Sequence, residues 1–521
     1  MLMADGDILL LFAPTFQSFG CDIGREFLLR SGGGKVHGLC AGYIETMEHV
    51  QDNLGHVGGQ FWHLNTEEKK WIEIETSPER LAEIDSKLGI GVFGRILVAD
   101  RRVGQGFVRG GLCRPDSIAK RVAFASSIMP QRYVLGLVEF LNKALDLVSP
   151  SVVFCYAVAG GPAVALAEVC SAKGIPFTRL NDIRIRERFV VDGGLSDELR
   201  CVAERYESEA VGYKCLDERR DEAKEILRKF RDNPEPPWYT KDIDTLLQNQ
   251  KALKLIFRFL LSIVFQATQG LIKKQNRLER MDRQWFNARI LWRRISGRSR
   301  QFSVNIPKSR PYIFYPLHVD PEASTMVQSP WHTDQVGIIE ALAKSAPADC
   351  LVVVKEHNPM LGKRPRGFYR AIAQIPRVIL VGPEHSGLSL IKGAKLISVI
   401  TGTAAFEAML LGKPALVIGA SPFLAVGQGM FHEPCLAKLP HAICKAMSMP
   451  SATDEALEKY LAACLVESFE MSGSLLWGTY ESHSKEERRQ AVEDIVDGIL
   501  KRMQETRLSI PDTAQEYKYS Q

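Results

Sequence analysis

The chain has 521 residues, of which 45% are hydrophobic and 24% are charged, and its formal net charge is +5 at pH 7. This composition is typical of a folded globular protein of about two or three domains and excludes a disordered or collagen-like chain. The eleven cysteines are scattered, without a CxxC pair or a His/Cys cluster at metal-ligand spacing. We therefore expect reduced thiols, and neither a metal nor a cofactor.

The amino-terminal residues, MLMADGDILLLFAPTF, contain an apolar run that is too short and too acidic at its start for a secretion signal. The sequence also has no stretch of about 18 uncharged apolar residues, which a membrane-spanning helix would need. We therefore expect a cytoplasmic protein.

Residues 1–200 have the alternating pattern of an α/β domain. A short apolar strand is predicted early in the chain, and a strand–turn–helix–strand pattern follows further on. An apolar run at 90–99 is also strand-like, and it leads into the basic, glycine-containing loop ADRRVGQGF. The other predicted elements are strands at 8–13, 151–158 and 175–180 and a helix at 163–173.

Residues 201–305 differ in character and predict a helical, basic insertion or linker. An apolar run at 255–272 precedes ten lysines and arginines between residues 273 and 300, against only two acidic residues. This pattern suits an anionic membrane surface. The basic run could instead meet an acidic glycan, or it could simply face water while the apolar side packs on the protein. We expect no nucleic acid, since no zinc finger or RNA-binding motif accompanies the charge.

Residues 306–450 predict a second α/β domain, and residues 451–521 predict carboxyl-terminal helices and a polar tail. In the second domain, short Val-, Ile- and Leu-rich runs alternate with helix-like segments, which is typical of a parallel sheet covered by helices. The predicted elements are strands at 312–317, 351–354, 378–381 and 396–400 and helices at 334–343, 453–464 and 485–503.

Two polar clusters follow strands of this second domain. Lys355 and His357 come after one strand, and Thr401, Gly402 and Thr403 come after another. Ligands of open α/β sheets bind at the carboxyl ends of the strands, so we expect the ligand-binding and catalytic side chains at these two positions. Thr401–Thr403 also open a predicted helix, whose first free N–H groups suit a phosphate.

Three stretches of the second domain, PYIFYPLHVDPEAST, VVKEHNPMLGKRPRGFYRAI and ITGTAAFEAMLLGKPALVIG, resemble the bacterial capsular polysaccharide biosynthesis family. The loops ADRRVGQGF and RLNDIRIRERF are similar to stretches in the amino-terminal half of such proteins. Members often have a His directly followed by Pro, whereas Asn358 here separates His357 from Pro359.

The resemblance implies a GT-B-like fold, with two Rossmann-type domains, a cleft between them and here a helical insertion. It also implies a transferase that moves a keto-sugar of the Kdo type from a CMP donor. In such folds a carboxylate at the position of Glu407 commonly binds a ribose. Glu407 could instead be an acid favoured by the first turn of its helix.

Breaking a sugar–phosphate bond leaves negative charge on the departing nucleotide, so the site needs fixed positive charge and hydrogen-bond donors. Lys355 offers charge, His357 a donor, and Thr401 and Thr403 hydroxyl groups. His357 could also be a structural histidine. The chain shows no DxD-like pair at a strand end, so we expect a metal-independent reaction. Glu322 would face the donor from the end of another strand.

The proton acceptor should come from the amino-terminal domain, across the cleft. Asp182 follows a predicted strand and is the candidate that we favour over Glu45, Asp100 and Asp192. Arg184 and Arg188 could hold the carboxylate of an acidic sugar bidentately, or they could form ordinary ion pairs.

These residues favour a glycosyltransferase that binds a nucleotide-sugar donor, preferably a CMP-sugar, in the carboxyl-terminal domain. It would act in the cytoplasm, on a glycan or lipid-linked acceptor at the inner membrane face. One alternative is a sugar-nucleotide epimerase of the same fold. Another is a non-catalytic protein of polysaccharide export or assembly.

Overall fold

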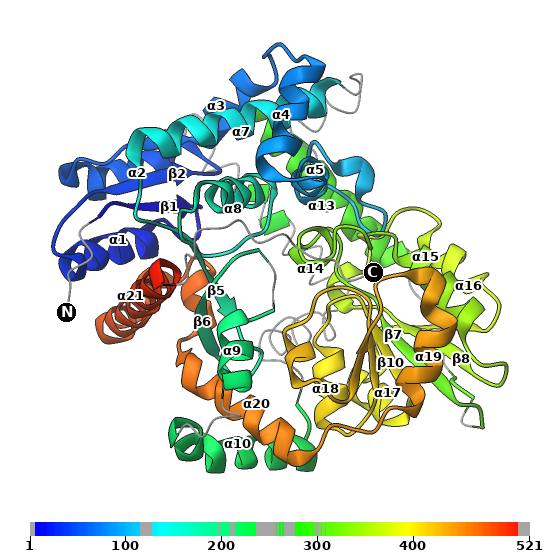
Figure 1. Ribbon diagram of the computed structural model, residues 1–521. Coiled ribbons are helices and arrows are strands. Elements are labelled where there is room, and N and C mark those ends of the chain that lie inside the picture. The colour runs from blue at the N-terminus through cyan, green and yellow to red at the C-terminus, as the bar shows by residue number, and fades with distance from the viewer. Residues whose placement is uncertain are drawn as a thin grey trace.

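Two β-sheets, each covered by helices on both faces, organise the chain (Figure 1). This architecture confirms the predicted fold class of two Rossmann-like α/β units. The computed structural model describes residues 6–114, 128–195, 198–208, 214–235, 257, 260–261, 263–264, 277–296, 302–303, 305–307 and 309–508.

The first sheet has the strand order β3-β2-β1-β4-β5-β6-β13, and the five strands from β3 to β5 are parallel. β6 pairs antiparallel with β5, and β13 pairs antiparallel with β6. β1, β2 and β4 bury every residue, as apolar strands covered on both faces must. The strands are β1 (Ile8–Phe12), β2 (Val36–Cys40), β3 (Phe61–His63), β4 (Val152–Cys155), β5 (Phe177–Asp182), β6 (Arg188–Gly193) and β13 (Phe469–Glu470).

Helices pack on both faces of this sheet and form two separate cores. One face is covered by α1 (Gln17–Ser31), α2 (Ile44–Leu54) and α21 (Lys485–Leu508). The other face is covered by α3 (Leu64–Trp71), α4 (Pro78–Leu88), α5 (Val92–Ala99), α7 (Ile128–Val148) and α8 (Gly161–Lys173).

The prediction of a strand at residues 90–99 is wrong, because residues 92–99 of this segment form helix α5. Its buried residues include Val92, Ile96 and Ala99, which recur at the helical spacing of four and three. Since α5 packs against α8, the helix needs a broad apolar side, and this is why the segment looked like a buried strand.

The second sheet has the strand order β9-β8-β7-β10-β11-β12, and all its pairs are parallel. Numbered along the chain, this is the order 3-2-1-4-5-6 of a dinucleotide-binding fold. From β7 the chain adds β8 and β9 on one side, and it then crosses to the other side of β7 to add β10, β11 and β12, so the strand order reverses between β7 and β10. The strands are β7 (Tyr312–Pro316), β8 (Leu351–Lys355), β9 (Val378–Val381), β10 (Leu396–Val399), β11 (Ala415–Val417) and β12 (Met430–His432).

Helices also cover both faces of the second sheet, and the short α14 (Ala323–Met326) follows β7. Asp334 caps the N-terminus of α15 by accepting a hydrogen bond from the Gly337 N–H. One face carries α15 (Gln335–Ser345), α16 (Phe368–Ala373) and α19 (Leu439–Ser448), and the other carries α17 (Gly387–Gly393), α18 (Ala404–Leu410) and α20 (Asp454–Glu467).

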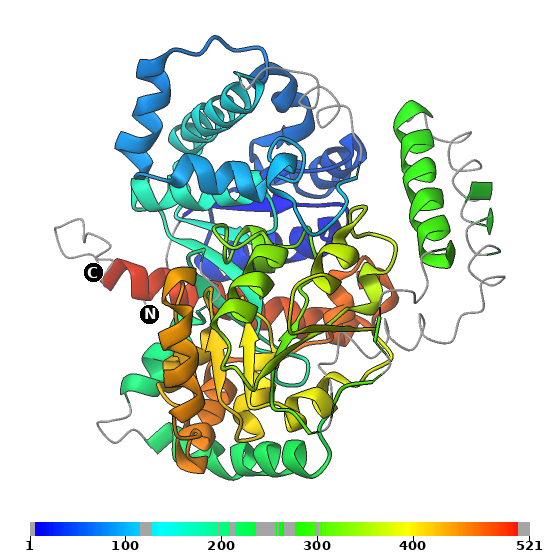
Figure 2. The same ribbon diagram turned by 90° about the vertical axis from the view of Figure 1, so that its right-hand side faces the viewer.

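Three described helices lie between the two sheets in the sequence. α9 (Arg200–Ser208) and α10 (Lys214–Asp232) pack against α20 and so extend the second unit. α13 (Arg277–Ser296) stands to one side, as the bright green helix at the right of Figure 2. Most of the apolar run at 255–272 and part of the basic run lie outside the described residues.

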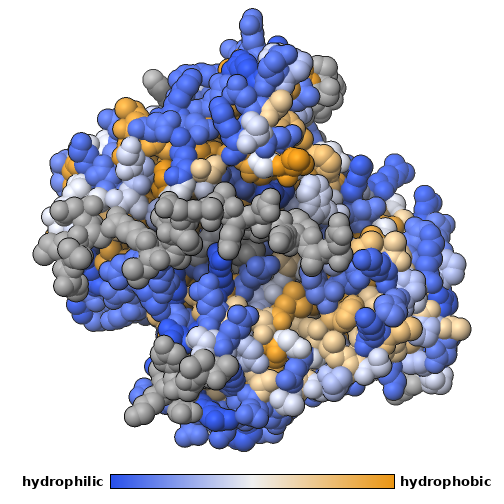
Figure 3. Space-filling view, in the orientation of Figure 1, coloured by the Kyte–Doolittle hydropathy of each residue, from blue (hydrophilic) through white to orange (hydrophobic). Residues whose placement is uncertain are grey.

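The surface in Figure 3 is largely hydrophilic, with smaller apolar areas over both units. Within the described ranges, every helix is too short or too polar to cross a bilayer.

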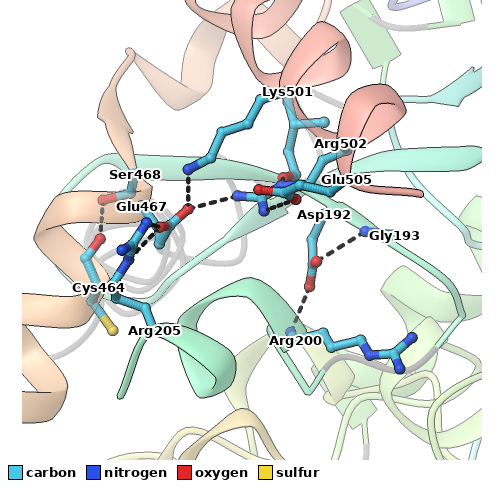
Figure 4. A network of polar contacts seen from close by, with 11 residues as sticks. Asp192, Gly193, Arg200, Arg205, Cys464, Glu467, Ser468, Lys501, Arg502 and Glu505 are labelled. Carbon is cyan, nitrogen blue, oxygen red and sulfur yellow. Dashed lines mark hydrogen bonds and ion pairs between the residues drawn. The ribbon is translucent and has the colours of Figure 1, made fainter. Parts of the chain in front are cut away.

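The chain returns to the first unit at its carboxyl-terminal end. After α20, β13 joins the edge of the first sheet and α21 packs against α1 and β6. Glu467, the last residue of α20, is at the centre of this junction (Figure 4). It accepts hydrogen bonds from Arg205 of α9 at 2.8 Å and from Lys501 and Arg502 of α21 at 2.6 Å each.

The carboxyl group of Glu467 is buried, with only 2% of the side chain exposed. Burial raises its pKa, but the bonds from Lys501, Arg205 and Arg502 outweigh that effect and hold the pKa below its ordinary value. Since Glu467 bonds helices of both units, this junction fixes the position of α21 relative to α9 and α20.

We predict that Glu467→Gln lowers the free energy of unfolding by about 3 kcal/mol at pH 7, because it removes the buried carboxylate that pairs with Arg502 and with the partly buried Arg205. The stabilisation from a depressed carboxyl pKa is present above about pH 4.3 and is lost as the pH falls. The deficit of the variant should therefore shrink in acid. Chemical denaturation measures both effects.

Glu486→Gln is the matched control, since Glu486 pairs with Arg489 at an exposed site and should change stability by less than about 0.5 kcal/mol. Equal stabilities of the two variants at pH 7 would contradict the role given to Glu467.

Candidate functional site

The point where the strand order of the second sheet reverses is occupied by two loops. His318 follows β7 and Thr401 follows β10, and the Thr401 N–H donates to His318 Nε2 at 3.3 Å. A Cβ atom at Gly402 would lie 3.2 Å from the same nitrogen, so a larger residue there would crowd the imidazole. Open α/β sheets bind their ligands at such reversal points.

His318 was not among the candidates from sequence, although its loop was recognised. Because Nε2 accepts a hydrogen bond, the proton of the neutral imidazole lies on Nδ1. Burial, with the charges of neighbouring groups, lowers the pKa of His318 to about 3, so the ring is neutral at physiological pH. Nδ1 is buried and has no hydrogen-bond partner among the described residues, which makes it a donor for a ligand or for water.

Other buried polar atoms near these strand ends share that property. Within the described ranges, Asp320 Oδ1, Asn358 Nδ2 and the Tyr315 hydroxyl also have no hydrogen-bond partner. Buried polar groups normally have a hydrogen-bond partner, so a ligand or water near the ends of β7 and β8 could satisfy these four atoms.

Lys355 and His357 lie at the end of β8, where they were expected. Burial lowers the pKa of His357 to about 3, and the positive charges of Lys355 and Arg364 add to this effect. His357 is therefore a neutral hydrogen-bonding group, and Lys355 carries the positive charge.

Glu407 lies in the first turn of α18, close enough to Lys355 for their charges to interact. Burial raises the pKa of Glu407 to about 8, and the Lys355 charge only partly opposes this shift. At neutral pH its carboxyl group is therefore largely protonated.

The two predicted threonines flank Gly402. The Thr401 hydroxyl donates to the Ser324 carbonyl at 3.0 Å, which joins the β10 loop to α14. Thr403 is the N-cap residue of α18, but its side chain forms no capping bond. The structure thus brings Lys355, His357 and residues 401–403 to one edge of the sheet.

A buried ion pair between Glu356 and Arg364 supports this edge. Arg364 donates from Nε to Oε2 at 2.7 Å and from Nη2 to Oε1 at 2.8 Å, and both side chains are almost fully buried. Glu356 also accepts from the His357 N–H at 2.6 Å, and Arg364 donates to the His318 carbonyl at 2.9 Å. The pair therefore fixes the backbone of both histidines.

Arg364 also contacts the first unit, since it donates to the Gly110 carbonyl at 2.8 Å. The Gly110 N–H in turn donates to Asp320 Oδ2 at 2.6 Å. Burial raises the pKa of Asp320 to about 6. A Cβ atom at Gly111 would lie 1.7 Å from the Asp320 carbonyl oxygen, so the two backbones touch here.

Of the remaining predicted residues, Glu322 follows β7, and Asp182 and Arg184 lie at the end of β5. Glu322 is exposed, at the N-cap position of α14, and its carboxylate accepts from the Ser324 hydroxyl at 2.9 Å. Asp182 ends β5, where it accepts from the Arg184 N–H at 2.7 Å and forms an ion pair of 3.2 Å with the Arg184 guanidinium.

Arg188 begins β6 and binds a different part of the chain. Its buried side chain binds the carboxyl-terminal segment, with bonds to the Ser468 hydroxyl at 2.9 Å, to Glu470 at 2.9 Å and to the Leu465 carbonyl at 3.2 Å. Arg188 thus fixes the crossing back to the first unit, a role that the sequence could not distinguish from carboxylate binding.

In the part of the chain that the structure describes, no three His, Cys, Asp or Glu residues gather as potential metal ligands.

Residues 222–437 match the family model for the capsule polysaccharide biosynthesis protein, which confirms the resemblance seen in the sequence. No curated protein matches the chain significantly.

Among solved structures, the beta Kdo 2,7 transferase of Thermosulfurimonas dismutans KpsC is 12% identical, with a TM-score of 0.35, over 69% of this chain and 89% of that chain. The beta Kdo 2,4 transferase of the same protein is 14% identical, with a TM-score of 0.36, over 62% and 82%. The UDP-GlcNAc 2-epimerase of Neisseria meningitidis is 10% identical, with a TM-score of 0.21, over 94% and 100%. Such low TM-scores carry no argument about activity, which must come from the residues.

We predict that Gly111→Ala lowers the free energy of unfolding by about 2 kcal/mol, because the added methyl group forces the loop away from Asp320. Gly106→Ala in the same loop is the control, since a Cβ atom there has no neighbour within 4 Å. Chemical denaturation compares them, and a Gly111→Ala protein as stable as Gly106→Ala would show that the two units do not depend on this contact.

Proposed function

We propose that the chain is a glycosyltransferase of capsular polysaccharide biosynthesis that transfers a keto-sugar of the Kdo type from a CMP donor to a glycan or lipid-linked acceptor. One observation carries the proposal: the neutral, buried His318 is bonded to Thr401 where the strand order of the second sheet reverses, and Lys355 ends the neighbouring strand β8. The family match over residues 222–437 supports the capsule context.

In this proposal the nucleotide binds between the β7 and β10 loops. Lys355 neutralises the phosphate, and His318, His357 and the hydroxyl groups of Thr401 and Thr403 form hydrogen bonds with its oxygens. The backbone at Gly402 lies close to the phosphate. Glu407 binds the ribose, and Glu322 faces the sugar from α14. No metal takes part.

Transfer forms a bond between an acceptor hydroxyl oxygen and the anomeric carbon, while the bond from that carbon to the phosphate oxygen breaks. The electron pair leaves with CMP, and the hydroxyl proton passes to a carboxylate. Asp182, at the carboxyl end of β5, is the carboxylate that accepts this proton, and Arg184 binds the carboxylate of the acceptor. We place the reaction in the cytoplasm, at the inner face of the membrane.

We predict that calorimetric titration shows tighter binding of CMP than of UDP or GDP. Lys355→Met and His357→Ala should each weaken CMP binding at least about tenfold, because charged and buried hydrogen bonds to the phosphate are lost. Lys392→Met is the control, since Lys392 is an exposed lysine of α17 in the same unit.

Preference for UDP would move the function toward another transferase or the epimerase. Release of free CMP from a CMP-sugar only when acceptor is present would support the transferase. Absence of binding to all three nucleotides would overturn the proposal and leave the non-catalytic assembly protein.

Glu407 gives a separate prediction about pH. Its pKa of about 8 means that the carboxylate forms as the pH rises from 7 to 9, above the phosphate ionisation at about 6. A carboxylate accepts ribose hydroxyl bonds better than a carboxylic acid, so CMP affinity should increase over this range. Glu407→Gln should bind CMP more weakly and lose that increase. The same increase in both proteins would contradict the role of Glu407.

A further inference from the structure

A hollow of about 750 Å³ lies between α13 and Leu112 and Cys113 of the first unit. The side chains that α13 contributes include Trp285, Arg289 and Trp292. Among the described residues that line the hollow, none is acidic. These residues make it an aromatic cavity with a positive charge, distinct from the loops that follow β7 and β10.

The position of α13 is set by the loop that follows β8. Arg293 donates to the Arg364 carbonyl, and Arg294 donates to Asn358 Oδ1 at 3.1 Å. Gly362, at a φ of +84°, allows close approach, because a Cβ atom there would lie 2.5 Å from the Ile290 carbonyl oxygen. One side of α13 is thus attached to the loop that carries His357 and Arg364.

The other wall of the hollow belongs to the loop that contacts Asp320. Leu112 and Cys113 directly follow Gly110 and Gly111, which touch the second unit at Asp320 and Arg364. The hollow therefore adjoins the contact between the two units.

Trp285, Arg289 and Trp292 recur at spacings of four and three, so they lie along one side of α13. The two indoles are 74% and 70% exposed and about 10 Å apart along the helix axis. Exposed tryptophans on a helix that is fixed at its other side offer two flat apolar faces, against which the C–H faces of sugar rings can stack.

The charges at this helix favour an anionic ligand. Burial, together with the like charge of Arg289, lowers the pKa of Arg293. A carboxylate bound bidentately to Arg289 from the side of the hollow would reduce this repulsion. An alkyl chain would instead desolvate the Arg289 guanidinium without a partner, which is unfavourable.

We propose that this hollow is a second saccharide-binding subsite, which holds an acidic sugar of the acceptor glycan away from the reacting end. The proposal rests on the proposed transferase function, since it supplies the glycan. Trp285 and Trp292 stack on two sugar rings of the chain, and Arg289 binds a carboxylate of one of them.

The test is a titration of the full chain, followed by tryptophan fluorescence, with an oligomer of sialic acid and with maltohexaose as the neutral probe. We expect a saturable change with the acidic oligomer alone. Trp292→Ala and Arg289→Gln should each weaken it at least about tenfold. Trp477→Phe is the control, since Trp477 is 70% exposed and lies in another part of the chain.

Equal binding of both oligosaccharides, or acidic binding that survives in Trp292→Ala and Arg289→Gln, would overturn the subsite. Quenching of Trp285 and Trp292 by vesicles of brominated phosphatidylglycerol, without oligosaccharide binding, would assign the hollow to a membrane surface instead. CMP titration of the same variants separates the two proposals. Intact CMP binding without oligosaccharide binding rejects only the subsite, whereas absence of CMP binding in the unmodified chain rejects the transferase.

Discussion

The buried ion pair between Glu356 and Arg364 is the interaction on which the candidate site depends. A buried pair stabilises little by itself, but removing one partner leaves an uncompensated charge in the interior. Here the pair also supplies the hydrogen bonds that hold His318, His357 and Gly110. The ends of β7 and β8 and a loop of the first unit are therefore arranged around one guanidinium group. A substitution at Arg364 or Glu356 would therefore disturb both the ends of these strands and the contact between the two units.

This arrangement explains the charges of the site. Because the histidines are buried and the Arg364 charge is nearby, both imidazoles are neutral, and their pKa values fall to about 3. Glu407 is largely protonated for the same reason, since burial disfavours its charge. Lys355 ends β8 beside these groups. In the proposed function, the phosphate of the nucleotide donor would lie next to Lys355 and the two neutral imidazoles.

Much of the second unit could be predicted from sequence, because each strand is a short apolar run and polar residues follow it directly. The positions of Lys355, His357 and Thr401 at or just after strand ends were predicted in this way. The role of Arg364 could not be predicted from local sequence, because its partner Glu356 is eight residues away and its partner Gly110 is 254 residues away. His318 was missed because a histidine in a loop has no distinguishing signal until Thr401 is placed beside it. Local pattern identifies strand ends, whereas pairing across the fold needs the structure.

The helix α13 shows why a run of charge in a sequence does not by itself name a partner. The run of basic residues predicted an anionic membrane surface as one of several possible partners, but in the structure individual arginines have different neighbours. Arg293 and Arg294 bind the loop after β8, whereas Arg289 lies between two exposed tryptophans on the side of the hollow. Among the described side chains of α13, that second side combines the aromatic faces and the positive charge that an acidic sugar needs. Since the same helix is bound to Asn358 and to the carbonyl of Arg364, a glycan held there would keep a fixed position relative to the loop that carries His357.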